Sequence, residues 1–287
     1  MRCLILFWVV FMAVASVAIA AEQKREPPMT VVIVRDSATD CEPLCPQWIS
    51  AEGEITSASP ALFRKAIAQS GTSKFPVLIQ SGGGDVRAAV EIGRMIRKRG
   101  LDVGVGWTSF RGSCKPDQKC RLPAENRNVY RGIAYHTEAY CSSACPLILA
   151  AGVNRTAGFG TYIGVHQVLT KWVQGDALTI REKYYIVHGR KKVVSRTIVA
   201  RKKGRSYTTN GLYKGLRNDL TAYLNTMGIS LDLFDDMDKA PPTSIYWLSG
   251  EELSSLKLVT SNEQSDSMVS RSVCRTAPRP SLCVGQN

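Results

Sequence analysis

The chain has 287 residues, of which 44% are hydrophobic, and a formal net charge of +13. That charge is local, because residues 171–217 hold thirteen lysines and arginines against two acidic residues, an excess of +11. No stretch beyond residue 21 is apolar for long enough to cross a bilayer, which excludes a protein with several membrane spans. The roughly 267 residues after residue 20 can form one large domain or two small ones.

Residues 1–20 have the pattern of a secretory signal peptide. One charge, Arg2, precedes an almost unbroken apolar run that ends in Ala-Ile-Ala, which is typical of a cleavage site. An uncleaved anchor is the alternative, because the apolar run Leu4–Ala21 is borderline in length for a span. We expect an exported protein, periplasmic if the source is a bacterium with two membranes.

Residues 30–106 alternate between strand and helix patterns. Buried strands are predicted at 30–35, 48–55, 75–80 and 101–106. A helix is predicted at 86–99, with Asp85 as its N-cap and Gly100 as its end. This alternation indicates an α/β fold with a parallel, mostly buried sheet.

A glycine loop, Ser-Gly-Gly-Gly-Asp, follows the third of these strands. Its glycines are Gly82, Gly83 and Gly84, and glycine lets backbone amides approach a ligand closely. Open α/β sheets bind their ligands at the carboxyl ends of strands, which is where this loop falls. An ordinary turn is the alternative.

Residues 107–140 are rich in glycine, proline, asparagine and charge, which predicts a loop. The loop contains Cys114 and Cys120, and a disulfide between them would stiffen it. Because the loop directly precedes Ser143 in sequence, it can act as a lid over that residue. A surface excursion is the alternative.

Two short stretches carry the candidate chemistry. Residues 141–152, Cys-Ser-Ser-Ala-Cys-Pro-Leu-Ile-Leu-Ala-Ala-Gly, place Ser143 at the entrance of an apolar helical run. Residues 163–167, Ile-Gly-Val-His-Gln, place His166 at the end of a strand. A nucleophilic serine needs a base to take its proton and fixed amides to hold the oxyanion, which His166 and the Ala144 amide can supply. The alternatives are a helix-capping serine and a buried histidine bonded to backbone.

A basic β-hairpin is predicted within residues 171–217. Alternating stretches at 184–187 and 193–199 are joined around a His-Gly pair. The thirteen basic residues are Lys171, Arg181, Lys183, Arg190, Lys191, Lys192, Arg196, Arg201, Lys202, Lys203, Arg205, Lys214 and Arg217. Such a ribbon can meet an anionic membrane surface, nucleic acid or an acidic partner, and a solvated face is the alternative. Nucleic acid is not expected, because the chain carries an export signal and no recognised reading module.

Eight cysteines lie beyond the signal peptide, an even number that fits disulfides in an oxidising compartment. They are Cys41, Cys45, Cys114, Cys120, Cys141, Cys145, Cys274 and Cys283. Cys114–Cys120 and Cys274–Cys283 are natural local pairs, and the second would staple a polar tail at 261–287. A Cys141–Cys145 bond would distort the turn that carries Ser143, so we expect at least one of the two to pair elsewhere, for example Cys141 with Cys114 or Cys120. The spacings differ from those of zinc ribbons and no histidine is grouped with them, so no metal site is expected.

Taken in this order, the glycine loop, the serine run and the His-Gln strand end resemble the Clp protease/crotonase superfamily, and most closely the proteolytic subunit of Clp protease. In that family a strand leads into a Ser-Pro-Gly-Gly-Ser loop, and a serine stands nine residues before the glycine of an Ala-Ala-Gly. Here Ser143 stands nine residues before Gly152. The resemblance covers roughly residues 31–106, 141–167 and 218–260. It implies stacked β-β-α units over residues 30–260, with 107–140 and 171–217 as insertions.

The resemblance also implies roles for the site residues. Ser143 is the expected nucleophile and His166 its base. The amides of Gly83 and Ala144 are the expected oxyanion hole. The neighbouring glycines, Gly82 and Gly84, are expected beside the substrate.

An orienting carboxylate is expected from a later helix, upstream of the Leu-Ser-Gly-Glu-Glu segment at 248–252. An ungapped alignment places Met237 at the family's aspartate position. Its neighbours Asp236 and Asp238 are therefore the candidates, and surface charges on a helix are the alternative.

These features predict an exported serine hydrolase, a Clp-like, ATP-independent peptidase that acts on peptides or unfolded proteins without a cofactor. A homo-oligomer is possible, but the family's handle sequence is not recognisable, so its double ring is not expected here. The main alternative is a catalytically weak or inactive relative that binds peptides or a partner in the cell envelope. A coenzyme A-dependent crotonase-type enzyme and a Ser–Lys peptidase are further alternatives, and no lysine is identified for the latter.

Overall fold

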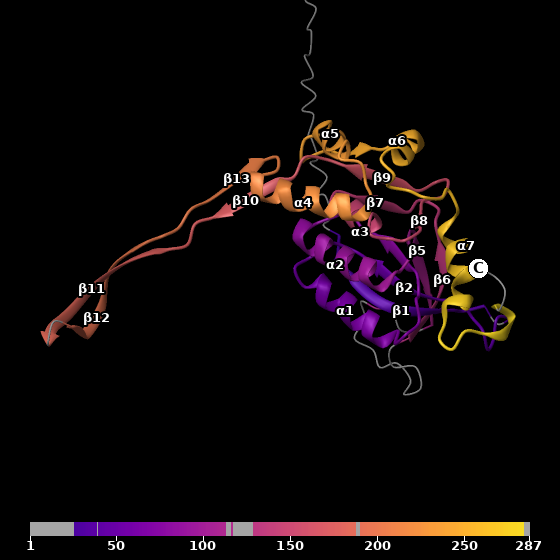
Figure 1. Ribbon diagram of the computed structural model, residues 1–287, viewed down its shortest axis with the longest axis horizontal. Helices are drawn as coiled ribbons and strands as arrows, with labels where there is room; N and C mark the ends of the chain where they lie inside the picture. Colours follow the sequence, from indigo (N-terminus) through magenta and orange to yellow (C-terminus); the bar gives the residue numbers. More distant parts are fainter. Residues whose placement is uncertain (1–25, 39, 113–115, 117–128, 188–189, 284–287) are drawn as a thin grey trace, which may run out of the picture.

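The computed structural model describes residues 26–38, 40–112, 116, 129–187 and 190–283. A seven-stranded sheet with the order β5-β6-β1-β2-β3-β4-β8 forms its centre (Figure 1). Its strands are β1 (Thr30–Asp36), β2 (Gln47–Glu52), β3 (Val77–Gln80), β4 (Val103–Val105), β5 (Trp107–Arg111), β6 (Val129–Tyr135) and β8 (Arg155–Thr156). Four neighbouring pairs are parallel, and β1–β2 and β5–β6 are antiparallel. The predicted α/β class with a sheet of largely parallel strands is confirmed.

Helices cover both faces of this sheet (Figure 1). Helices α1 (Ser59–Gln69) and α2 (Val86–Arg99) lie on one side, and α7 (Ser265–Ser270) lies on the other. The side chain of Asp85 accepts a hydrogen bond from the Ala88 amide at 2.9 Å, and Gly100 ends α2 in a left-handed conformation. The predicted cap and end of this helix are therefore confirmed, and its apolar face is buried against the core.

A second sheet carries the two candidate site residues. Its strands, in the order β14-β9-β7, are β14 (Tyr246–Trp247), β9 (Tyr162–Val165) and β7 (Tyr140–Ser142). Strand β7 runs parallel to β9, and β14 is antiparallel to it. The helices around this sheet are α3 (Cys145–Leu149), α4 (Lys214–Met227), α5 (Leu233–Asp238) and α6 (Gly250–Ser255). Ser143 follows β7 directly, and His166 follows β9 directly.

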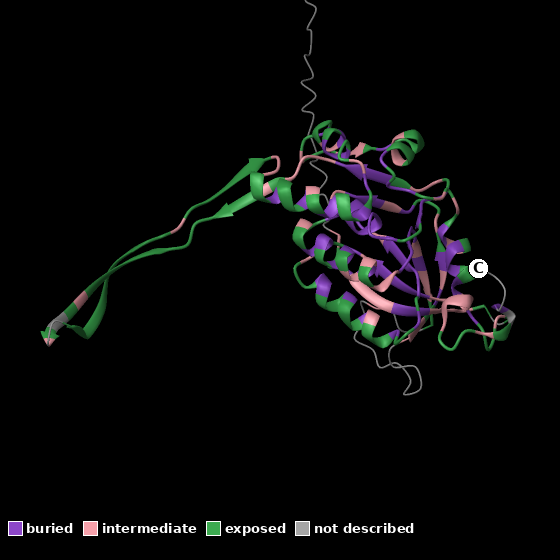
Figure 2. Cartoon of the chain, viewed as in Figure 1, coloured by how far each residue is buried: buried purple, intermediate pink, exposed green. Residues whose placement is uncertain are grey.

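The basic segment leaves the body of the molecule as a long ribbon (Figure 1). At its base, β10 (Leu169–Val173) pairs with β13 (Ser206–Asn210). Farther out, β11 (Ala177–Val187) pairs antiparallel with β12 (Arg190–Lys202). Figure 2 shows that the ribbon is exposed along almost its whole length.

The prediction that 107–140 is a loop is wrong in part. Residues 107–111 and 129–135 form β5 and β6, which pair with each other and extend the central sheet beyond β1. Aromatic and β-branched residues provide the strand propensity here, with Trp107 stacked on Tyr135 at a centroid distance of 4.8 Å. Cys114 and Cys120 lie outside the described residues.

Disulfides join Cys141 to Cys145 and Cys274 to Cys283. The prediction for Cys274–Cys283 is confirmed. The expectation that Cys141 and Cys145 pair elsewhere is wrong, because Ser143 between them adopts a left-handed conformation with φ of 61°. This conformation folds the turn tightly, and the two Cα atoms lie 5.2 Å apart, within the range that a disulfide needs.

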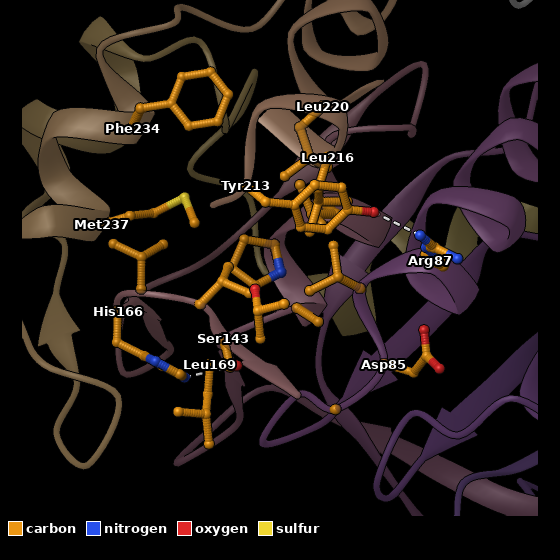
Figure 3. A pocket seen from close by; sticks show the side chains of 18 of the residues that line it. Asp85, Arg87, Ser143, His166, Leu169, Tyr213, Leu216, Leu220, Phe234 and Met237 are labelled. Carbon is orange, nitrogen blue, oxygen red and sulfur yellow. Dashed lines mark hydrogen bonds between the residues drawn. The ribbon is translucent and has the colours of Figure 1, made fainter. Parts of the chain in front are cut away.

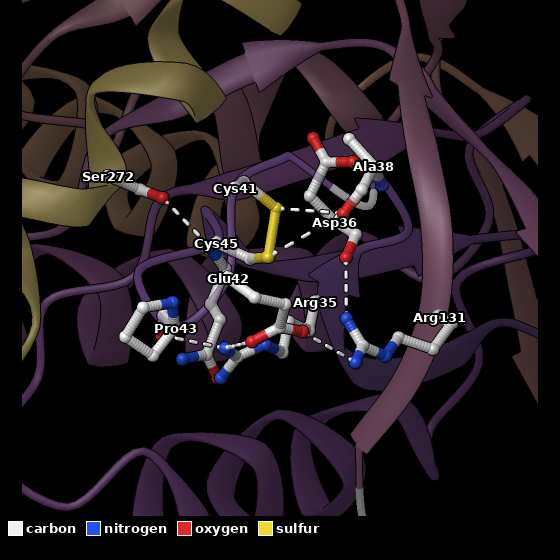
Figure 4. Close-up of a disulfide and its surroundings, with 10 residues drawn as sticks. Arg35, Asp36, Ala38, Cys41, Glu42, Pro43, Cys45, Arg131 and Ser272 are labelled. Atoms are coloured by element: carbon white, nitrogen blue, oxygen red, sulfur yellow. Dashed lines mark hydrogen bonds and ion pairs between the residues drawn. A yellow bond between two sulfur atoms is a disulfide. The ribbon is translucent and has the colours of Figure 1, made fainter.

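A further disulfide, Cys41–Cys45, closes the connection between β1 and β2 (Figure 4). Glu42 lies inside this small loop and pairs with Arg35 at 2.5 Å and with Arg131 of β6 at 2.7 Å. These hydrogen bonds from two guanidinium groups, first that of Arg131, hold the pKa of Glu42 below its usual value. The loop is thereby tied to the neighbouring strand.

Residues 265–283 pack on the body of the molecule. In α7, Met268 and Val269 are buried in a small cluster with Trp48 and Leu78 of the central sheet. Two 3-10 turns follow, Arg271–Arg275 and Ser281–Cys283. The predicted signal peptide at 1–20 lies outside the described residues, and in the described part no helix is long and apolar enough to span a membrane.

Candidate active site

Ser143 and His166 are in direct contact. The Nε2 atom of His166 lies 2.7 Å from the Oγ atom of Ser143. The pairing of β7 with β9 sets Ser142 beside Gly164, so Ser143 and His166 lie one and two residues beyond neighbouring strand positions. The Ser143 amide also donates to the Gly164 carbonyl at 2.9 Å.

The second ring nitrogen of His166 decides which tautomer is present. Nδ1 lies 2.7 Å from the backbone carbonyl oxygen of Gln167. A carbonyl oxygen can only accept, so Nδ1 carries the proton of the neutral ring and Nε2 presents its lone pair to Ser143. This is the tautomer that a general base needs.

The predicted carboxylate is not brought to the imidazole. Asp236 is buried, and its side chain pairs with Lys239 at 2.7 Å. Asp238 is exposed, and its backbone carbonyl accepts from the Gln167 side chain at 3.4 Å. Spacing explains the first result, since residues three apart share one face of a helix and Lys239 therefore captures the Asp236 carboxylate. A backbone carbonyl, that of Gln167, takes the position at Nδ1 that was expected for an aspartate.

Lys239 also belongs to a network of charged and polar side chains. The ammonium group of Lys239 bonds to Asp236, Glu252 and Tyr246, and these hydrogen bonds raise its pKa well above the usual value. The Tyr246 hydroxyl donates to Glu252 at 2.6 Å and is the largest cause that lowers the pKa of Glu252 to about 2. Tyr246 is part of β14, the strand beside β9, so the network ties α5 and α6 to the strand that carries His166.

The glycine loop touches the serine. A Cβ atom at Gly83 would lie 2.4 Å from the Cβ atom of Ser143, so only glycine fits there, and its φ of 105° also favours glycine. The Gly83 amide, however, donates to the Oγ atom of Ser81 at 3.0 Å. The Gly82 amide donates to the carboxylate of Glu26 at 2.8 Å. The two amides therefore bind within the protein, whereas Gly84 lines the cavity together with Ala144.

Ser143 and His166 open into an apolar cavity of about 590 Å³ (Figure 3). Its walls come from α2, α3, α4, α5 and the base of the ribbon. Apolar side chains that line it include Val86, Leu147, Leu216, Leu220, Phe234 and Met237. On one side the Arg87 guanidinium donates to the Tyr213 hydroxyl at 2.6 Å. A cavity of this size accommodates a side chain of a peptide or a small acyl group.

Some site residues were missed by the sequence analysis. Leu169 and Trp172, from β10, line the cavity, as does Tyr213. The sequence did contain an indication of their role. Leu169 and Trp172 are large apolar residues that closely follow His166, and Tyr213 directly precedes α4, at the other end of the basic segment. The hydrogen bond from His166 to the Gln167 carbonyl could not be predicted, because its acceptor is a backbone atom and not a particular side chain.

In the described part of the chain, no group of three or more histidine, cysteine or acidic residues is placed to hold a metal ion. No family model matches the chain, and no curated protein matches it.

Several solved structures are similar. The 1510-N membrane-bound stomatin-specific protease, as a variant in complex with a substrate peptide, is 15% identical with a TM-score of 0.40, over 77% of each chain. ClpP1 from Listeria monocytogenes is 16% identical with a TM-score of 0.37, over 72% of this chain and 84% of its own. At these identities and TM-scores, the likeness says nothing about the reaction or its residues.

Proposed function

We propose that the protein is a serine hydrolase, and specifically a Clp-like peptidase that works without ATP. One observation carries the proposal: the 2.7 Å contact between His166 Nε2 and Ser143 Oγ, with Nδ1 bonded to a carbonyl. A buried histidine with only a structural role would bond to backbone groups. It would have no reason to place its basic nitrogen beside a serine hydroxyl at the mouth of a cavity.

The proposed reaction uses these two side chains in sequence. Ser143 Oγ attacks the carbonyl carbon of a peptide bond while its proton passes to His166 Nε2. The imidazolium then gives this proton to the leaving amine, and the C–N bond breaks to leave an acyl group on Ser143. Water, deprotonated by His166, cleaves the ester and restores the serine. These steps need no cofactor.

The oxyanion hole is the less complete part of the proposed site. The Ala144 amide, next to the nucleophile at the cavity wall, is the proposed first donor. Gly83 can be the second only if its amide leaves Ser81 when substrate enters. The amide of Gly84, which lines the cavity, is the alternative donor.

The proposed substrate is a peptide or an unfolded protein with an apolar residue at the scissile bond. The cavity walls beside Ser143 are apolar, so burial of an apolar side chain there is favourable by about 25 cal/mol per Å² of surface. We also propose that the protein is exported, on the signal pattern at 1–20 and the disulfides, and that it can form a homo-oligomer. An ATP-driven unfoldase is not expected in that location.

The test is labelling with a fluorophosphonate, which traps activated serines. Ser143→Ala should abolish labelling, and Ser142→Ala, a change to the neighbouring buried serine, should not. His166→Ala should slow labelling by at least about a hundredfold, whereas His136→Ala, in the same chain but outside the cavity, should leave it within a few-fold. A folded wild-type protein that is not labelled would contradict the proposal.

Two observations favour a second candidate, a catalytically weak relative that binds peptides. The Gly83 amide is bonded to Ser81, and a neutral carbonyl occupies the place of an orienting carboxylate. A carbonyl holds the tautomer but stabilises the imidazolium less than a carboxylate does. If Ser143→Ala and His166→Ala both bind apolar peptides as wild type does, and wild type cleaves none, this candidate is favoured.

A further inference from the structure

The outer ribbon, β11 with β12, has no other described element packed along it (Figure 1). A two-stranded hairpin by itself is at best marginally stable in water. This one is long, since its register runs from Ala177 opposite Lys202 to Val187 opposite Arg190. We therefore expect a partner surface to stabilise the ribbon, and the side chains on its two faces indicate the chemistry of that partner.

One face of the ribbon carries exposed aliphatic side chains. On β11, alternation places Leu178, Ile180 and Ile186 on the same face. On β12, Ile198 lies directly opposite Ile180, and Val193 follows on the same side of the register. Their exposed fractions run from 40% at Val193 to 60% at Ile186. A row of this kind on a projecting element is typical of an interaction surface.

The other face is basic. Arg181, Lys183, Arg190 and Lys192 alternate there with threonine and serine, opposite to the aliphatic row. Residues 177–202 hold eight lysines and arginines and one acidic residue, Glu182. On the aliphatic face, Arg201 lies opposite Leu178, Arg196 opposite Glu182 and Lys191 opposite Ile186. The Glu182 carboxylate pairs there with Lys191 at 2.6 Å and with Arg196 at 2.8 Å. The ribbon therefore presents a strong positive charge around an apolar stripe.

We propose that this ribbon docks on a bilayer of anionic phospholipid. The aliphatic row would enter the boundary between headgroups and acyl chains, and the lysines and arginines would lie among the phosphates, within the Debye length of the charged surface. A second copy of the chain fits less well, because it would bring an equally basic ribbon against the first. Nucleic acid would use the charge but would gain nothing from the aliphatic row.

The base of the ribbon, β10 with β13, carries an aromatic pair close to the cavity. Trp172 and Tyr207 stack there with ring centroids 6.3 Å apart, and both are partly exposed. Aromatic rings with a polar end are typical of the membrane interface. Trp172 also lines the cavity beside Ser143, so a docked ribbon would hold the cavity close to the lipid surface. The docking itself does not depend on the proposed peptidase activity.

Sedimentation of the full-length protein with vesicles tests the proposal. Binding to vesicles that contain phosphatidylglycerol should exceed binding to pure phosphatidylcholine by at least about tenfold and should fall at high salt. Lys183→Glu with Lys192→Glu should reduce that binding by at least about tenfold. Ile180→Ser with Ile198→Ser should reduce it similarly.

Matched controls use the body of the molecule. Lys65→Glu with Lys98→Glu makes the same charge change on exposed positions of α1 and α2. Leu62→Ser in α1 with Val153→Ser, between α3 and β8, removes two exposed aliphatic groups. Both should bind vesicles as wild type does. Thermal unfolding of every variant shows whether the body is folded. The salt dependence of vesicle binding by the wild-type protein tests the proposal without any variant.

Three results would overturn the proposal. The first is equal or absent binding to the two vesicle types. The second is loss of binding with the charge reversal but not with the serine pair, which would show that charge alone holds the ribbon on an anionic surface and that the aliphatic row does not enter the bilayer. The third is self-association that both ribbon variants abolish while vesicle binding persists, which would indicate a second copy.

Discussion

The hydroxyl of Tyr223 donates a 2.6 Å hydrogen bond to the backbone carbonyl of Leu147. Tyr223 belongs to α4 and is almost fully buried, and Leu147 belongs to α3, which follows Ser143. The cavity wall and the serine turn are therefore joined by one bond. Burial also raises the pKa of Tyr223 well above its usual value, so the hydroxyl stays a donor.

Tyr223→Phe should lower the free energy of unfolding by about 1–2 kcal/mol, because it leaves a buried carbonyl without its donor. Urea denaturation measures this change. Tyr207→Phe, at an exposed tyrosine of β13, is the control and should change stability by less than about 0.5 kcal/mol. Equal effects would show that the bond to Leu147 contributes nothing particular.

Gly83→Ala should abolish fluorophosphonate labelling, because the new methyl group would collide with Ser143. Either the loop or the serine must then move, and the alignment of Oγ with His166 is lost. Gly250→Ala is the control, since nothing lies within 4 Å of its added Cβ atom. Labelling of Gly83→Ala at the wild-type rate would mean that the loop can shift without disturbing the serine.

Asp236→Asn should leave the labelling rate within about threefold of wild type. An aspartate that orients a catalytic histidine is worth about 10⁴ in rate, whereas Asp236 pairs with Lys239 and not with His166. Labelling kinetics on a variant that remains folded separate these values clearly. A loss of a thousandfold or more would reinstate Asp236 as the third member.

Removal of the Cys141–Cys145 bond by two alanines should slow labelling of Ser143 by at least about tenfold. Ser143 sits inside this bridge in a left-handed conformation, which costs a residue other than glycine about 1–3 kcal/mol. The bridge is one of the constraints that hold it. The matched control is Cys41→Ala with Cys45→Ala, because both bridges have a sequence separation of 4. Equal rates for the two double variants would contradict a positioning role.

Glu252→Gln should make the protein less sensitive to acid between about pH 4.5 and pH 2. The folded-state pKa of Glu252 is lowered to about 2 from 4.5. Its contribution to stability is therefore fully present above pH 4.5 and is lost as the pH falls toward 2. Melting temperatures of wild type and variant across this range measure the effect, and Glu251→Gln, at the exposed neighbour, is the control. Parallel curves for all three proteins would show that the bonds to Tyr246 and Lys239 do not stabilise the fold.

The regular elements were predictable where periodicity and capping agree. The helix after Asp85 and the strands around it followed from the pattern of apolar residues along the sequence, and Gly100 predicted where the helix ends. The strand that ends before His166 and the short helix after Ser143 also followed from sequence, whereas strand β7, which ends at Ser142, did not. The meeting of the two side chains depends on strand pairing, which was available only through the resemblance to a known family.

Other features depend on backbone geometry that residue types do not specify. The Cys141–Cys145 bridge needs the left-handed conformation of Ser143, and a serine gives no sign of it. The partner of His166 Nδ1 is a main-chain oxygen, which every residue possesses. The strands β5 and β6 were hidden by the polar segment that separates them.

Gln167 lies between His166 and the ribbon, and it makes three hydrogen bonds. Its amide donates to Ala240, its side chain donates to Asp238, and its carbonyl accepts from His166. These bonds fix the backbone between His166 and Leu169, where the ribbon begins. A change in the direction of the ribbon therefore need not alter the orientation of the imidazole.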